Sequence, residues 1–191
     1  MYAIVKDGSI TATGTIKQLF PNTSFAGGVA NADFKTAEGV VDIVQGERKD
    51  QKYYFVTQGN VELVDGVPTQ QYTNTAKRLN DEDAKDNDGN QLYVQVWDED
   101  TNKMVDTSEK IISQGLKTII TAEVKETANK LLASTDWMVI RKYERDVAIP
   151  SATATYRAAV ITECARLETA IANAADVDAL ATVMAGQDWP N

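Results

Sequence analysis

The chain has 191 residues, of which 43% are hydrophobic, so it is long and apolar enough to fill a core without disulfide bonds. Its formal net charge of −9 opposes the phosphate backbone of nucleic acids, and the cations Arg141, Lys142 and Arg145 are interleaved with Glu144 and Asp146. The absence of histidine removes the commonest general base, the commonest transition-metal ligand and the usual activator of a Ser or Cys nucleophile. These features argue against nucleic-acid binding and against catalysis, and they predict no cofactor and no metal site.

No membrane segment is expected. The sequence has no run of eighteen apolar residues, and its N-terminal stretch, MYAIVKDGS, soon reaches a turn signal instead of forming a basic and then apolar leader. We therefore expect no membrane partner and a soluble protein in the cytoplasm where it is made. The single cysteine, Cys164, fits a reducing compartment.

Short apolar runs separated by turn residues fill residues 1–106, which is typical of β-strands. The dipeptides Asp7-Gly8 and Asp65-Gly66 are expected to form hairpin turns, because Asp-Gly readily adopts the positive φ angles of a type I′ turn. In LYVQVWDED (92–100), alternate residues lie on opposite faces, which predicts a half-buried strand. The expected strands cover 2–5, 9–16, 39–44, 53–58, 61–73 and 92–100, with a short helical turn broken at Pro21.

From Thr107 onward the apolar period changes to three or four residues, which predicts helices. A first helix of about 25 residues is expected to start at a Thr107 or Ser108 cap, a second after Pro150 with Ser151 as cap, and a short third at an Asp176 cap. The stripe of the first helix consists of Ile112, Leu116, Ile119, Ile120, Val124, Leu131 and Leu132.

The predicted fold class is therefore α+β, with an antiparallel β-rich N-terminal domain (1–106) and an α-helical C-terminal domain (107–191) made of a helical hairpin and a short tail helix. Two helices bury little apolar surface by themselves, so the stripe needs a further partner. Either the β-rich domain or further copies of the chain can supply it. We favour association of copies and expect a homo-oligomer, a trimer or a dimer.

The polar stretch LNDEDAKDNDGN (79–90) clusters carboxylates in a loop, an arrangement that suits hard cations such as Ca²⁺. Its spacing does not fit an EF-hand, because placing Gly89 at the sixth loop position puts Ala84 first and Gln95 twelfth. We expect a solvated surface loop, and calcium binding of another kind stays open.

Two further groups are candidate catalytic residues. Cys164 lies on the apolar stripe of the second predicted helix, where a small buried hydrophobic residue is the expected role. Acid pairs such as Asp98 and Asp100 are of the kind that glycoside hydrolases use, but these two lie in a predicted turn of a carboxylate-rich chain. Neither feature predicts an active site.

The segment STDWMVIRKYERDVAIP (134–150) is expected to form a short helix between the two long ones, since Trp137 and Ile140 are three residues apart. Trp137 is expected to pack into the angle between those helices. Arg141, Arg145 and Glu144 are expected to form an exposed face of ion pairs or, alternatively, the two arginines dock an acidic partner.

Two parts of the sequence resemble proteins of tailed bacteriophages. The succession of MYAIVKDG, LFPNTSF, GVVDIV and NVELVDGVPTQQY resembles the N-terminal region of small tail or tail-fibre-associated proteins. The stretch LLASTDWMVIRKYERDVAIP followed by YRAAV resembles the helical segment of the phage tail assembly chaperone family. The positions that carry this second resemblance are Leu131, Leu132, Asp136, Trp137, Pro150, Tyr156 and Arg157.

The resemblance implies a non-enzymatic structural component of a tailed-phage virion, located in the tail, the baseplate or the fibre-attachment region. Its expected partners are other phage tail, baseplate or fibre proteins, and its expected location is the virion after synthesis in the host cytoplasm. The alternatives are a tail or tail-fibre assembly chaperone absent from the mature virion and a carboxylate-dependent glycan hydrolase. The expected interaction or packing anchors are Trp137, Ile140, Arg141, Arg145, Tyr156 and Arg157.

Overall fold

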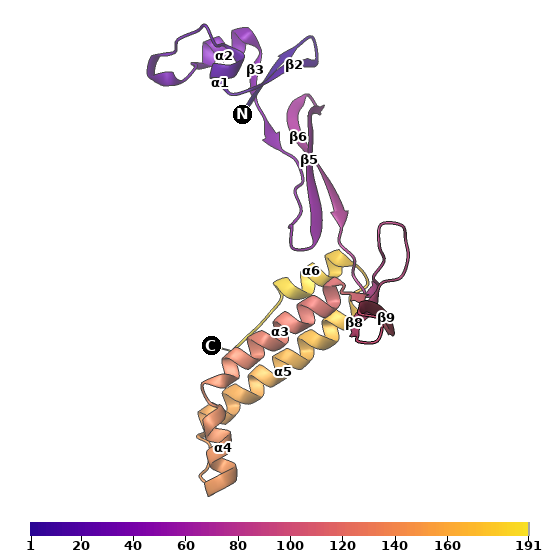
Figure 1. Ribbon diagram of the computed structural model, residues 1–191. Coiled ribbons are helices and arrows are strands. Elements are labelled where there is room, and N and C mark those ends of the chain that lie inside the picture. Colours follow the sequence, from indigo (N-terminus) through magenta and orange to yellow (C-terminus); the bar gives the residue numbers. More distant parts are fainter. Residues whose placement is uncertain (191) are drawn as a thin grey trace. The chain divides into compact units, whose positions relative to one another are not determined.

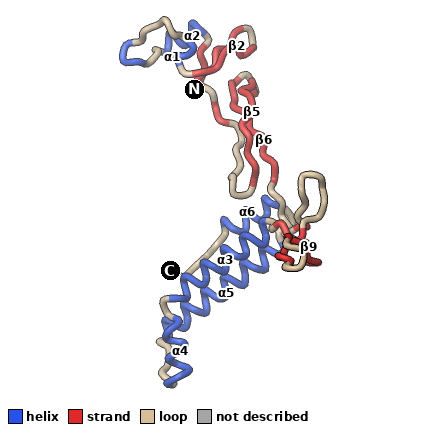
Figure 2. The backbone as a smooth tube through the Cα atoms, in the orientation of Figure 1, coloured by secondary structure: helices blue, strands red, loops and turns tan. Residues whose placement is uncertain are grey.

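The computed structural model describes residues 1–190, and the chain forms two compact units, Met1–Ala76 and Lys77–Asn191. Antiparallel strand pairs predominate in the first part of the chain and helices in the last part, which confirms the predicted α+β class (Figure 1). The backbone trace coloured by secondary structure shows the same division (Figure 2). Within the described residues, no helix is both long and apolar enough to span a membrane.

The first unit begins with a three-stranded antiparallel sheet in the order β2-β1-β3. Its strands are β1 (Tyr2–Lys6), β2 (Ser9–Gly14) and β3 (Val40–Asp42). The predicted turn between β1 and β2 is confirmed, because Asp7 and Gly8 have φ angles of 51° and 69°. Ala3 and Val40 are buried in this sheet.

Short helical segments connect β2 to β3. They are α1 (Ile16–Leu19), the 3₁₀ turn η1 (Ala26–Gly28) and α2 (Ala32–Glu38). The ring of Phe34 in α2 lies edge to face with those of Phe20 and Phe25, at centroid distances of 5.0 and 4.9 Å. α1 ends before Pro21 as expected, and the aromatic contacts hold the connection together.

A second sheet of the first unit has the order β4-β6-β5. It consists of β4 (Val44–Gln45), β5 (Tyr54–Val64) and β6 (Val67–Ala76). β5 and β6 form a long hairpin around Asp65 and Gly66, whose φ angles of 50° and 80° confirm the second predicted turn. Gln70 is buried beside the β5 bulge, and its side-chain amide donates to the Gly59 carbonyl at 2.6 Å. The buried amide thus satisfies backbone that the bulge leaves unpaired.

The second unit opens with two small antiparallel pairs. β7 (Glu82–Asp83) pairs with β10 (Ile112–Ser113), and β8 (Tyr93–Asp98) pairs with β9 (Lys103–Lys110). The predicted helix cap at Thr107 or Ser108 is wrong, because both residues lie in β9. Residues 103–110 pair with β8 in an antiparallel hairpin, and this strand pairing overrides the apolar period from which the cap was predicted.

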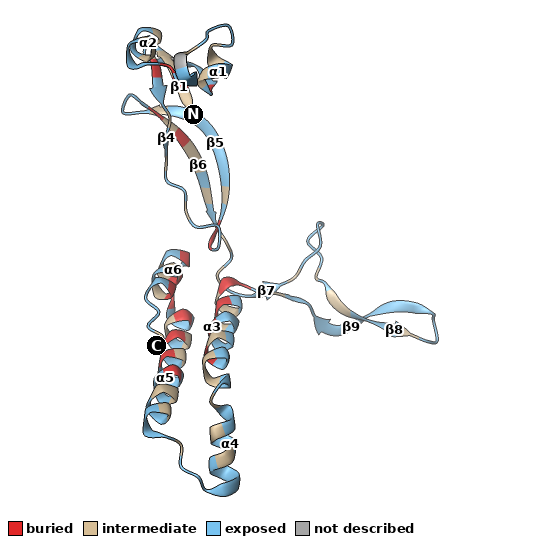
Figure 3. Cartoon of the chain, turned by 90° about the vertical axis from the view of Figure 1, so that its left-hand side faces the viewer, coloured by how far each residue is buried: buried red, intermediate tan, exposed pale blue. Residues whose placement is uncertain are grey.

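Four helices complete the second unit, and α3 lies alongside α5 (Figure 1). They are α3 (Leu116–Ala133), α4 (Asp136–Arg145), α5 (Ser151–Asn173) and α6 (Val177–Ala185). The predicted helical hairpin and tail helix are confirmed, although α3 has 18 residues and starts later than expected. Ile120, Leu167, Ile171 and Leu180 are each 0% exposed and form the core between α3, α5 and α6 (Figure 3).

The helix starts and the domain boundary differ in part from expectation. Asp176 caps α6 as predicted and accepts from the Ala179 amide at 2.8 Å, but Pro150 takes the N-cap position of α5 and Ser151 is already helical. The predicted boundary after residue 106 falls inside β9, whereas the compact units divide after Ala76. The change of apolar period at Thr107 falls inside β9, before α3 begins at Leu116, and β7 to β10 make their contacts in the unit that holds the helices. The last residue of the predicted range 107–191 lies outside the described residues.

Candidate interaction surfaces

Arg157, in the second turn of α5, joins the end of α3 to the start of α4. Its Nη1 donates to the Leu132 carbonyl at 3.0 Å and to Thr135 Oγ1 at 2.6 Å, and it pairs with Asp136 Oδ1 at 2.9 Å. The Arg157 side chain is only 16% exposed, and its charge faces the carbonyl end of α3, where the helix dipole is negative. Three positions of the family resemblance, Leu132, Asp136 and Arg157, therefore meet at one joint. Arg157 acts there as a packing anchor.

α4 has no buried residue among the ten that form it. Trp137 is 51% exposed and Ile140 57% exposed, while Tyr143 is almost wholly exposed. The Arg141 guanidinium lies 4.8 Å from the Trp137 ring centroid, within range of a cation–π contact. The sequence predicted that Trp137 packs into the angle between the long helices. That prediction is wrong, because half of the Trp137 side chain is exposed. We call Trp137, Ile140, Arg141, Tyr143 and Arg145 the α4 surface.

The ion pairs of α4 also differ from those expected. Lys142 pairs with Asp146, on the side of α4 away from Trp137. Within the described chain, Arg141 and Arg145 form no ion pair, and Nε of Arg141 is buried without a hydrogen-bond partner. The α4 surface therefore combines apolar area with two uncompensated cations, which is the composition of an interface core and suits a partner with acidic groups. Tyr156, next to Arg157, is half-buried.

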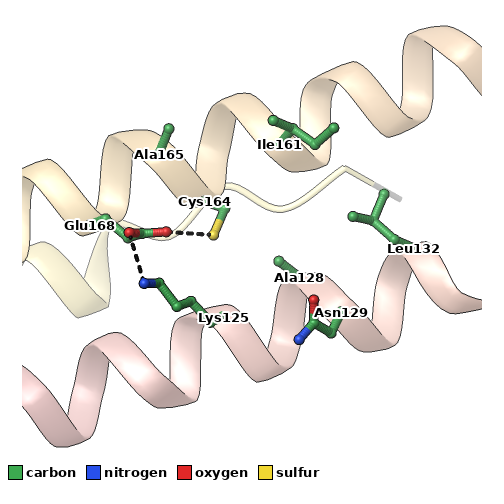
Figure 4. A pocket seen from close by; sticks show the side chains of 8 residues that line it. All are labelled: Lys125, Ala128, Asn129, Leu132, Ile161, Cys164, Ala165 and Glu168. Atoms are coloured by element: carbon green, nitrogen blue, oxygen red, sulfur yellow. Dashed lines mark hydrogen bonds and ion pairs between the residues drawn. The ribbon is translucent and has the colours of Figure 1, made fainter.

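A groove between α3 and α5 contains the sulfur of Cys164 (Figure 4). The Cys164 thiol donates to Glu168 Oε1 at 3.3 Å, and Lys125 Nζ lies 3.3 Å from Glu168 Oε2. Burial, with the neighbouring Glu168 carboxylate, raises the pKa of Cys164. A raised pKa keeps the thiol protonated, so the chemistry of this site is that of packing and hydrogen bonding.

Two carboxylates of the loop 79–90, those of Asp81 and Asp86, accept hydrogen bonds from other groups of the chain. Asp81 Oδ1 accepts from the Gly115 amide at 2.7 Å and Oδ2 from Thr118 Oγ1 at 2.9 Å, and these bonds lower the pKa of Asp81. Asp86 accepts from the side chain and backbone of Asn90, which likewise lowers its pKa. Within the part of the chain that the structure describes, no three His, Cys, Asp or Glu residues gather to hold a metal ion. Asp81 thus caps α3 from a distance, a role that its sequence position did not reveal.

Asp98 is the last residue of β8, and Asp100 lies in the turn between β8 and β9. Asp98 Oδ1 accepts from the Asp100 amide at 2.9 Å and the Thr101 amide at 3.3 Å, and bonds to Thr101 and Asp100 lower the pKa of Asp98. A general acid of a glycoside hydrolase needs a raised pKa, so the shift at Asp98 is in the wrong direction for that role.

Glu163 is a buried carboxylate that sequence reasoning missed. It lies on the buried side of α5, pairs with Arg166 through two bonds of 2.6 and 2.7 Å, and accepts from the Asp188 amide at 2.8 Å. The bonds from Arg166 hold the pKa of Glu163 below its ordinary value. The signal in the sequence was a charged residue among the apolar positions 160, 167 and 171, with an arginine three residues later. Together the pair fixes the C-terminal segment against α5.

Most residues of the β8–β9 hairpin are exposed (Figure 3), and they include apolar side chains on both of its faces. Val96 opposes Val105 and Trp97 opposes Met104, and all four are exposed. The prediction of a half-buried strand is therefore wrong for β8, because no other element among the described residues covers either pair. An isolated two-stranded hairpin is marginal in water, so these pairs are a second surface that a partner would stabilise.

Comparison with protein-family models, with curated proteins and with solved structures gives no match to this chain.

Proposed function

We propose that the chain is a non-enzymatic structural component of a tailed-phage virion, in the tail, the baseplate or the fibre-attachment region, and that it works through protein–protein interfaces. The observation that carries the proposal is the amount of surface that the chain leaves open. Two separate compact units of the sizes of Met1–Ala76 and Lys77–Asn191 would expose roughly 11,000 Å² in total. The chain exposes 12904 Å².

The difference, about 2,000 Å², is more than twice the roughly 800 Å² that one partner contributes to a standard interface. It is also apolar in part, since large hydrophobic side chains are exposed on the α4 surface, on both faces of β8–β9 and on the β5–β6 hairpin. Single exposed apolar residues are ordinary, but groups of them on three elements are typical of a subunit that other chains cover.

The resemblance to phage proteins supplies the biological setting of the proposal. The segment from Leu131 to Arg157 that resembles the tail assembly chaperone family includes the Arg157 joint and the exposed α4 surface. The joint fixes the direction in which α4 leaves α3, and α4 then presents its apolar and cationic residues. We infer that the α4 surface binds another tail, baseplate or fibre protein through acidic and apolar groups.

Mass spectrometry of purified particles and of infected cells tests the proposal. A structural component is expected in mature particles at a fixed copy number relative to other tail proteins. Presence in infected cells combined with absence from mature particles would refute the structural role and favour an assembly chaperone.

A variant pair then tests the α4 surface. Ile140→Asp places a charge on that surface, whereas Lys142→Ala changes the other side of the same helix and serves as the control. We expect the Ile140 variant to fold with unchanged far-UV circular dichroism and to be lost from particles at least tenfold, while the Lys142 variant is incorporated normally. Equal incorporation of both variants would exclude the α4 surface as the contact.

A further inference from the structure

One side of the α3–α5 helical hairpin carries a continuous open groove. Two adjoining hollows of about 350 and 520 Å³ share Lys125 as a lining residue. The groove extends along α3 from Lys117 to Leu132 and along α5 from Ala172 to Ile161. It therefore follows four turns of α3, and the 18 residues of that helix span about 27 Å.

The opposite side of the hairpin is already covered. Glu163 and Arg166 of α5 bind the C-terminal segment through the Asp188 amide and the Gly186 carbonyl. On α5, these residues face away from Ile161 and Glu168, which line the groove. The groove is thus the side of the hairpin that lacks a covering helix, and two helices alone bury little.

Several residues that line the groove have small side chains, which allow another helix to pack closely. Ala128 and Cys164 present small side chains where α3 and α5 face each other (Figure 4). Ala165, also small, and Ile161, which is 56% exposed, line the outer part of the same hollow. Small residues let another helix approach to the interaxial distance of about 8–10 Å at which helices pack.

The charges of the groove fit a second copy of the chain as the occupant. Lys125 on α3 and Glu168 on α5 form an ion pair across it, and their side chains are 55% and 37% exposed. A two-fold axis through the groove places Lys125 of one copy beside Glu168 of the other, so the surface is complementary to itself, as a two-fold interface requires. Each carboxylate and each ammonium can then have two opposite neighbours.

We propose that two copies of this chain associate through the groove, with α3 and α5 of one copy packed on α3 and α5 of the other in a four-helix bundle. Two helical hairpins meet in such a bundle with their apolar sides inward. A face two helices wide and about 27 Å long is of the order of the roughly 800 Å² per partner of a standard interface, and the chain's open surface exceeds that area. The inference adds a contact between two copies of the chain to the protein–protein interfaces of the proposed function, and it rests on that function only in this respect.

Light scattering coupled to gel filtration, on the purified full chain at about 100 μM, tests the inference. The wild type is expected at twice the chain mass of 20.9 kDa. Ala165→Arg fills the open groove with a long cation, and its dimer should dissociate at least tenfold more readily. Ala159→Arg makes the same change at an exposed position on the side of α5 away from the groove, and it should stay dimeric. Circular dichroism establishes that both variants are folded.

A charge exchange gives a second readout. Lys125→Glu alone should weaken the dimer, and combining it with Glu168→Lys should restore it, because the exchanged pair has the same complementarity. A monomeric wild type, a trimer, or a dimer that tolerates Ala165→Arg would overturn the inference. Incorporation into particles is measured separately, so such a result would not by itself refute the proposed function.

Discussion

At the scale of single residues, the Arg157 joint shows how one side chain positions a helix. Its guanidinium donates hydrogen bonds to the Leu132 carbonyl and the Thr135 hydroxyl and forms an ion pair with the Asp136 carboxylate. The side chain is largely shielded from water. The sequence alone indicated Arg157 as an anchor only through a family resemblance. Its three acceptors come from a turn more than twenty residues earlier, so periodicity could not reveal them.

Arg157→Ala is expected to lower the free energy of unfolding by about 1.5–3 kcal/mol, because it removes charge-assisted hydrogen bonds at a partly buried site. Arg157→Lys should recover only part of the loss, since an ammonium does not reproduce the planar fork. Urea unfolding followed by circular dichroism measures both. Arg145→Ala, at an exposed residue of the same tip, is the control and should change stability by less than about 0.5 kcal/mol. Equal losses of unfolding free energy in the Arg157 and Arg145 variants would contradict the role of Arg157 in stabilising the connection between α3 and α4.

Glu163 makes stability depend on pH. Because its folded pKa lies below the unfolded value of about 4.3, its contribution is fully present above that pH and is lost as the pH falls through the folded pKa. Glu163→Gln should therefore be less stable than the wild type at pH 7, and the difference should shrink toward pH 3. Thermal unfolding at a series of pH values measures this. A difference that stays constant down to pH 3 would show that the carboxylate charge is not the cause.

At the scale of elements, α3 starts where a remote carboxylate caps it. The local sequence offered Thr107 and Ser108 as caps, but the chain continues as β9 and the helix begins after Gly115. Asp81 supplies the missing acceptor from a loop 34 residues earlier. A cap provided by tertiary structure has no signature in the residues that precede the helix.

Asp81→Ala should expose the first turn of α3, because it removes the acceptor of the Gly115 amide and of the Thr118 hydroxyl. Amides of residues 115–118 are expected to exchange with deuterium roughly fivefold faster. Asp88→Ala, in the same loop, should leave their exchange unchanged. Hydrogen exchange with mass spectrometry compares the two variants, and unchanged protection in the Asp81 variant would argue against remote capping.

At the scale of the whole molecule, the chain divides into two compact units, and the contacts that stabilise each unit lie mainly within it. Residues 77–191 contain the four long elements α3 to α6 together with β7 to β10. The fragment 77–191 is expected to fold alone and to unfold cooperatively. Its circular dichroism should show the helix content that these residues have in the full chain. A fragment cut at the sequence-predicted boundary, 107–191, loses β8 and the Asp81 cap and should be less stable in urea. Equal stability of the two fragments would favour the boundary at 106.

The sequence by itself determined the elements whose signals are local. The Asp-Gly turns, the Asp176 cap, the short helix that contains Trp137 and the α+β order all follow from backbone preferences and apolar periods within a few residues of each feature. Only the tertiary structure decided where α3 begins, which carboxylates act as caps, that Glu163 is a buried ion-pair partner, and which apolar residues stay open. Those outcomes depend on contacts between residues 25 to 37 positions apart, and on which faces the chain itself leaves uncovered, neither of which a local pattern contains.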